Sequence, residues 1–300
     1  MFDRAQTREY RHITDEYMVV QLCPIRKKAK GKRHARQNPT GAAQARLNER
    51  NARHKLHLQI LANFTPNDYA VHPTFDNGTL PTDIDDLARM CSNWLRRCKR
   101  AWAKETGKDA KDFKARIVYE ISEHGRPHVH AVMSGGLSPL RMQEVWGHGR
   151  LTADPLKFDE AGLCGLTTYF LKNRITYRRW TGTRNLIEPQ EKIRDTYISP
   201  AMARKIDENP EDKQAVEALY PGWCVGEIVP TAKDEIVDID ESTGEVALGA
   251  YTTIFLYRED NAYFRRTARG IDYRYLPQLQ EKRKRKLCRL RRQLRGFVVP

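Results

Sequence analysis

Several features that are common in other protein classes are missing from this chain of 300 residues. No run approaches the roughly 18–20 apolar residues that a membrane-spanning helix needs, and the first residues lack the apolar core of a signal peptide. The six cysteines lie far apart without a CxxC pair, which argues against a disulfide framework and a structural zinc site. A GxxxxGKS or GxxxxGKT phosphate loop is also missing, so we expect no ATP-driven helicase. These absences together favour a soluble protein of a reducing cytoplasm.

Acidic residues are too few to balance the basic ones. Lysine and arginine number 53 against 38 aspartates and glutamates, which gives a formal net charge of +15. Such an excess indicates a polyanionic partner, and nucleic acid before a membrane surface. The positive charge is concentrated in the runs 26–36 and 282–295, which are either phosphate-binding segments or solvated tails. The stretch 207–245 is acidic, as a solvated surface or a contact face for a basic protein would be.

The pattern of apolar residues predicts an α+β fold. Helices are expected at 42–53, 84–102 (after a Thr82-x-x-Asp85 capping box), 138–146 and 159–173. Strands are expected at 56–64 and 69–75, and a β-hairpin is expected from 116–123 and 128–134. This order is typical of an antiparallel sheet with helices packed on it. A helix at 199–206 and strands at 222–230 and 250–258 predict a small α+β C-terminal unit.

The hairpin is where candidate chemistry first appears. His128 and His130 lie on one face of the second strand, because side chains alternate along a strand. A three-residue loop at 123–125, with Gly125 in the left-handed conformation, places Glu120 directly opposite His128. Two imidazoles and a carboxylate suit an open site for Mg²⁺ or Mn²⁺, although histidines on a half-exposed sheet are often ordinary surface residues.

Tyr169 and Lys172 form a second candidate pair. In a helix over 159–173 their spacing of three places the phenol and the ammonium on one helix face. Attack of a phenolate on a phosphodiester needs a cation at the non-bridging oxygens, which Lys172 and a metal ion would supply. A tyrosine on an amphipathic helix is usually a packing residue, so the pair carries weight only together with the histidines.

The order of these motifs resembles the HUH endonucleases that initiate rolling-circle replication, especially the filamentous-phage gene II protein type and related plasmid and phage initiators. The resemblance spans roughly residues 45–195, through NERNARHKLHLQILANF, DYAVHPTF, Glu120 with GRPHVHAV, VWGHGR, LTTYFLK and RNLIEP. Pro73 departs from the plain apolar-Thr-aromatic strand of the first motif. Tyr177 is not one helical turn from Tyr169, as the second tyrosine of two-tyrosine initiators is.

The resemblance implies an HUH/RRM-like palm and a role for each motif residue. His128 and His130 would hold Mg²⁺ or Mn²⁺ with Glu120 as third ligand, Tyr169 would be the nucleophile, and Lys172 would position the metal or the phosphate. The residues expected to contact DNA are Thr74, Arg126, Arg96, Arg97, Lys99 and Arg100. The domains would be a basic N-terminal segment (1–54), an HUH endonuclease domain (55–195), a small accessory unit (196–260) and a basic C-terminal tail (261–300).

The activity implied is nicking of single-stranded origin DNA by tyrosine transesterification, with a 5′-phosphotyrosine link, a free 3′-hydroxyl and strand rejoining at termination. The implied partners are a host DNA helicase and polymerase, in the bacterial host cytoplasm if the chain is phage-encoded. The terminating nucleophile is open between Tyr177, the tyrosine of a second subunit and the hydroxyl of the growing strand, and so is the oligomeric state. A plasmid relaxase or an HUH transposase would share the histidines and the tyrosine, whereas a non-catalytic basic nucleic-acid-binding protein would need neither.

Overall fold

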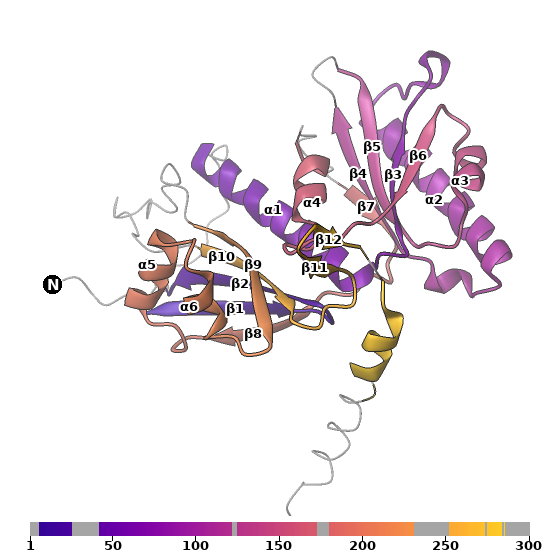
Figure 1. Ribbon diagram of the computed structural model, residues 1–300. Coiled ribbons are helices and arrows are strands. Elements are labelled where there is room, and N and C mark those ends of the chain that lie inside the picture. The colour runs from indigo at the N-terminus through magenta and orange to yellow at the C-terminus, as the bar shows by residue number, and fades with distance from the viewer. Residues whose placement is uncertain are drawn as a thin grey trace, which may run out of the picture.

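The computed structural model describes residues 6–25, 42–121, 125–172, 180–230, 252–273, 275–283 and 285, without the side chains of 42–47. Two five-stranded antiparallel sheets lie on either side of one long helix, α1 (Ala42–Asn63), as Figure 1 shows. The predicted α+β class, with helices packed on antiparallel sheets, is confirmed. Among the helices of the described ranges, none combines the length and the apolar composition needed to cross a membrane.

The first of these sheets, called the central sheet here, contains the predicted hairpin. Its strand order is β6-β3-β5-β4-β7, formed by β3 (Tyr69–Pro73), β4 (Ala115–Ile121), β5 (Pro127–Met133), β6 (Leu151–Pro155) and β7 (Trp180–Gly182). Glu120 pairs with His128 between β4 and β5, so the predicted register is confirmed. Gly125 has a φ of 73°, the left-handed conformation expected at that loop position, whereas 122–124 lie outside the described residues.

Helices α2 (Ile84–Thr106) and α3 (Pro139–Trp146) cover one face of the central sheet. The side chain of Asp83 accepts a hydrogen bond from the backbone of Asp86 at 2.8 Å, so Asp83 and not Thr82 caps α2. Trp94 and Trp146 are fully buried with ring centroids 5.0 Å apart, which joins the two helices. Aromatic side chains of this size contribute several kcal/mol of burial and fix this face of the sheet.

The second sheet, called the terminal sheet here, has the strand order β8-β1-β2-β10-β9. Its strands are β1 (Thr7–Ile13), β2 (Tyr17–Pro24), β8 (Gln190–Arg194), β9 (Trp223–Val229) and β10 (Thr252–Arg258). Helices α5 (Pro200–Glu208) and α6 (Lys213–Glu217) pack on one face of it. The helix and the two strands predicted between 199 and 258 are thus present. The sequence analysis missed β1 and β2, which join part of the segment 1–54 to strands of the predicted accessory unit.

The strand predicted at 56–64 is wrong, because α1 continues as a helix to Asn63. Leu56 and Ile60 are fully buried in a core that also contains Val118 of the central sheet and Phe255 of the terminal sheet. A helix that lies between two sheets carries apolar residues on more than one side, so its composition imitates that of a buried strand.

The helix predicted at 159–173 is shorter in the structure, where α4 runs over Cys164–Phe170. Asp159 and Gly162 exchange backbone hydrogen bonds of 2.9 and 3.0 Å, and Gly162 has a φ of 76°. This tight turn occupies the residues that the predicted helix would have used for its first turn. At the other end the helix stops at Phe170 with Leu171 as its C-cap, so Lys172 lies beyond it.

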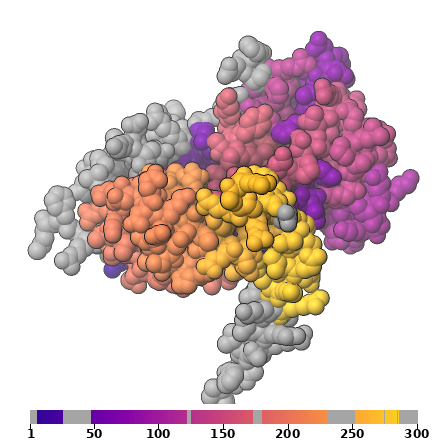
Figure 2. All heavy atoms as spheres, viewed as in Figure 1, coloured from indigo at the N-terminus to yellow at the C-terminus, as the bar shows by residue number. Residues whose placement is uncertain are grey.

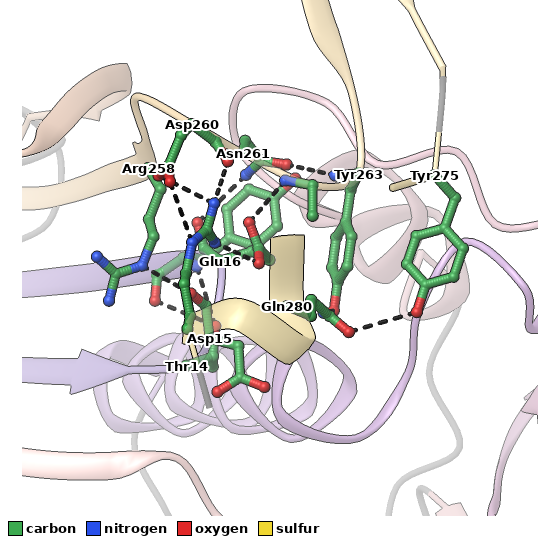
Figure 3. Close-up of polar contacts among 12 residues, drawn as sticks. Thr14, Asp15, Glu16, Arg258, Asp260, Asn261, Tyr263, Tyr275 and Gln280 are labelled. Carbon is green, nitrogen blue, oxygen red and sulfur yellow. Dashed lines mark hydrogen bonds and ion pairs between the residues drawn. The ribbon is translucent and has the colours of Figure 1, made fainter. Parts of the chain in front are cut away.

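The C-terminal part of the described chain is fixed to the turn between β1 and β2. It consists of the hairpin β11 (Arg265–Thr267) and β12 (Gly270–Asp272) and a helical stretch at 277–283. Arg283 donates to the fully buried carboxylate of Glu16 at 2.5 Å, and the backbone of Ala262 donates to it at 2.7 Å, as Figure 3 shows around Glu16. The second residue of the basic run 282–295, Arg283, is therefore anchored.

Candidate functional site

The face of the central sheet opposite α2 holds a buried histidine–carboxylate pair. Nε2 of His130 on β5 lies 2.6 Å from Oε2 of Glu120 on β4, and both residues are more than 90% buried. Burial lowers the pKa of His130, which favours the neutral ring. Because a carboxylate only accepts hydrogen bonds, Nε2 of His130 is the donor and Nδ1 is left as the acceptor.

His72 extends this pair, and the sequence analysis did not identify it. It lies on β3, which pairs with β5, and its Nδ1 is 2.9 Å from Nδ1 of His130. Burial also lowers the pKa of His72. With Nδ1 of His130 as acceptor, His72 is the donor, so Glu120, His130 and His72 form one hydrogen-bonded chain. Alternation along β3 put His72 on a definite face, but only the observed strand order shows that this face meets His130.

Tyr169 lies over the same histidines. Phe170 is fully buried and stacks on His130, with ring centroids 5.0 Å apart and an interplanar angle of 16°. The ring of Tyr169 meets His130 edge-on at 5.2 Å and His72 at 6.2 Å, while 54% of Tyr169 stays exposed. Helix α4 is thus attached through Phe170, and it leaves the phenol at the rim of the cluster, where solvent and a ligand can reach it.

Lys172 does not share a helix face with Tyr169 as predicted, because it lies beyond the end of α4. It is exposed, and its backbone N–H donates to the carbonyl of Tyr169 at 3.3 Å. This turn brings the backbones of the two residues together, but it does not stack their side chains on one helix face.

The predicted metal ligands share a sheet face, but they do not converge. His130 directs its two ring nitrogens to different partners, Glu120 and His72. Within the part of the chain that the structure describes, no group of three or more His, Cys, Asp or Glu side chains is arranged to hold a metal ion. The imidazole nitrogens of His128 and His130 and the carboxylate of Glu120 are ligand types that suit a divalent ion. In the structure, however, His130 and Glu120 are arranged as a hydrogen-bonded pair.

Two of the expected DNA-contacting residues lie together near the end of β3. Thr74 is exposed, and its hydroxyl donates to the carbonyl of Arg150 at 2.9 Å. Arg126 is exposed on the β4–β5 hairpin and donates to Asn77 at 3.0 Å and to the carbonyl of Phe75. The guanidinium therefore connects the hairpin to the segment that follows β3.

The four cations of α2 are not brought to this site. Arg96, Arg97, Lys99 and Arg100 belong to the helix that covers the opposite face of the sheet, so the sheet separates them from His130 (Figure 1). Arg97 is partly buried and donates to the carbonyl of Trp146 at 3.1 Å, which gives it a structural contact. Tyr177 and the basic run 26–36 lie outside the described residues.

Comparison with protein-family models, curated proteins and solved structures finds no match to this chain. The basis for a function is therefore the motif order in the sequence and the geometry of the central sheet.

Proposed function

We propose that this chain nicks and rejoins single-stranded DNA by transesterification at Tyr169, as an initiator of rolling-circle replication of the HUH type. The observation that carries the proposal is the placement of a half-exposed Tyr169 edge-on against His130, which in turn is hydrogen-bonded to Glu120. Packing alone would favour burying a tyrosine ring, whereas a nucleophile must be accessible to a strand.

The proposed reaction exchanges one phosphodiester for another. The phenol oxygen of Tyr169 attacks phosphorus, the bond from phosphorus to the 3′-oxygen breaks, and the proton lost by the phenol is balanced by the proton gained at the 3′-oxygen. The product is a 5′-phosphotyrosine link with a free 3′-hydroxyl, which a host polymerase extends after a host helicase opens the duplex. Because no water is consumed, the reverse reaction rejoins strands.

The surrounding residues hold the nucleophile in place. Glu120 and His72 fix the His130 ring from two sides, and Phe170 on that ring fixes α4. Such preorganisation raises the effective concentration of phenol at a bound phosphate. Lys172 is exposed three residues after Tyr169, and we propose that its ammonium contacts a non-bridging oxygen. The Mg²⁺ or Mn²⁺ implied by the resemblance stays a prediction, and we assign it no step.

The test is formation of a covalent adduct. The protein is incubated with Mn²⁺ and circular single-stranded DNA of its own replicon, and the products are separated on a denaturing gel. We expect an adduct that disappears in Tyr169→Phe. The matched control is Tyr197→Phe, because Tyr197 is also a half-exposed tyrosine (42%) but lies after β8 of the terminal sheet. DNA binding without an adduct, or an adduct that survives in Tyr169→Phe, would exclude Tyr169 as the nucleophile.

A further inference from the structure

The hairpin β11–β12 concentrates positive charge on the surface. Arg265, Arg266 and Arg269 fall within five residues, and all three are exposed. The one acidic residue between 265 and 272 is Asp272, which pairs with Arg265 in the strand register. The two strands form a ribbon closed by a tight turn, in which the hydroxyl of Thr267 donates to the carbonyl of Gly270 at 2.9 Å.

The ribbon lies beside the start of α4. Nε of Arg266 is 3.2 Å from Oε1 of Glu160, a residue of the turn that precedes this helix. Ile271 is partly buried and packs against the same core as Cys164 and Leu166 of α4. Figure 1 shows β11 and β12 next to α4, and Figure 2 shows the C-terminal residues, in yellow, on the surface between the two halves of the molecule.

The base of the ribbon is rigid. Phe264, directly before β11, is buried with its ring centroid 5.1 Å from that of Tyr257 on β10. After β12, the hydroxyl of Tyr275 donates a hydrogen bond to Oε1 of Gln280 at 3.3 Å. Nε2 of Gln280 donates in turn to the hydroxyl of Tyr263 at 2.8 Å (Figure 3). The backbone that carries the arginines is therefore held in place by packing. Binding a ligand through them costs less conformational entropy than binding through a free tail would.

We propose that the hairpin β11–β12 binds the phosphate backbone of single-stranded DNA next to the nicking site, through Arg265 and Arg269. The assignment rests on the proposed function. Arg266 forms an ion pair with Glu160, whereas among the described residues Arg265 and Arg269 form no ion pair with an acid. Helix α4 is roughly 10 Å long. The hairpin lies beside the start of this helix and Tyr169 lies near its other end, so the contact falls about one helix length from the bond that Tyr169 attacks.

The proposal is tested by binding in a Tyr169→Phe background, so the result does not depend on covalent chemistry. The affinity for a fluorescent single-stranded oligonucleotide is measured by anisotropy between about 50 and 200 mM salt. We expect Arg265→Ala/Arg269→Ala to weaken binding about tenfold and to reduce the salt slope by roughly 1.4, the value for two lost phosphate contacts on a single strand. Arg265→Lys/Arg269→Lys, which keeps the charge, should retain most of the slope.

The matched control is Arg204→Ala/Lys205→Ala. Arg204 and Lys205 are exposed on α5, the helix that packs on the face of the terminal sheet away from α1. Replacing both with alanine lowers the net charge by the same amount as the hairpin variant does. Equal weakening in both alanine pairs, or none in the hairpin pair at an unchanged thermal midpoint, would overturn the proposal. If the protein forms no adduct through Tyr169 but its DNA binding depends on Arg265 and Arg269, the proposed nicking activity is excluded and the proposed DNA contact of the hairpin is supported. A parent protein without DNA binding would overturn both proposals.

Discussion

His57 makes the packing of α1 sensitive to acid. It is 97% buried, with Nδ1 3.4 Å from the hydroxyl of Thr167 on α4 and its ring 5.4 Å from that of Phe255 on β10. Burial lowers the pKa of His57 from 6.5 to about 4. In the unfolded chain His57 takes up a proton below pH 6.5, whereas in the folded protein it does so only near pH 4, so stability is lost as the pH falls through this window. At pH 5, about 1.5 units below the unfolded value, the loss is about 2 kcal/mol at roughly 1.36 kcal/mol per unit.

The assay is urea unfolding at pH 7.5 and pH 5, followed by circular dichroism. Other groups also titrate between these values, including the partly buried His54, whose pKa burial lowers to about 3. The wild-type protein is therefore compared with His57→Gln, which keeps a polar group but does not titrate. We expect the pH-dependent loss of unfolding free energy to be smaller in His57→Gln by about 2 kcal/mol. An equal loss in both proteins would refute the assignment of a neutral, buried His57.

Three further predictions follow from the packing and from the proposed chemistry. Glu16→Gln leaves Arg283 without its buried carboxylate and should lower the free energy of unfolding by about 2–3 kcal/mol, with faster proteolysis of the C-terminal segment; unchanged proteolysis would contradict the anchor. Gly135→Ala would place a Cβ 1.8 Å from a backbone oxygen and should cost about 1–3 kcal/mol in urea unfolding, whereas Gly165→Ala, with nothing within 4 Å, should be neutral or stabilising. The ion implied by the resemblance alone predicts that chelation of divalent ions abolishes the adduct and that Mn²⁺ restores it; an adduct that persists in chelator would exclude this ion.

The register of the hairpin could be predicted because it depends on local chemistry. The loop length and Gly125 set the pairing, and the apolar residues Ile117, Tyr119 and Val129 had to face the core together. Helix α2 was predictable for the same reason, since a helical period of buried residues that continues from Leu87 to Trp102 is a strong signal.

The remaining features depend on contacts between distant segments. His72 joins the candidate site only because β3 lies beside β5, and strand order is not encoded in either strand alone. The apolar composition of 56–64 suits a buried strand as well as a buried helix. The helix is distinguished only by its position between two sheets, which the segment itself does not encode. β1 was missed because TREYRHI mixes charged and apolar residues, which its pairing with β2 and β8 tolerates at a half-exposed face.

The terminal sheet sets an order of events during synthesis. β1 and β2 leave the ribosome before the other described strands, but the second edge of β2 is completed only by β10, about 230 residues later. The strands of the central sheet all lie between these two points, so that sheet can assemble while β2 still has an unpaired edge. A nascent chain that stalls before residue 252 would expose the apolar strand YMVVQLCP as an open edge, which is a site for aggregation.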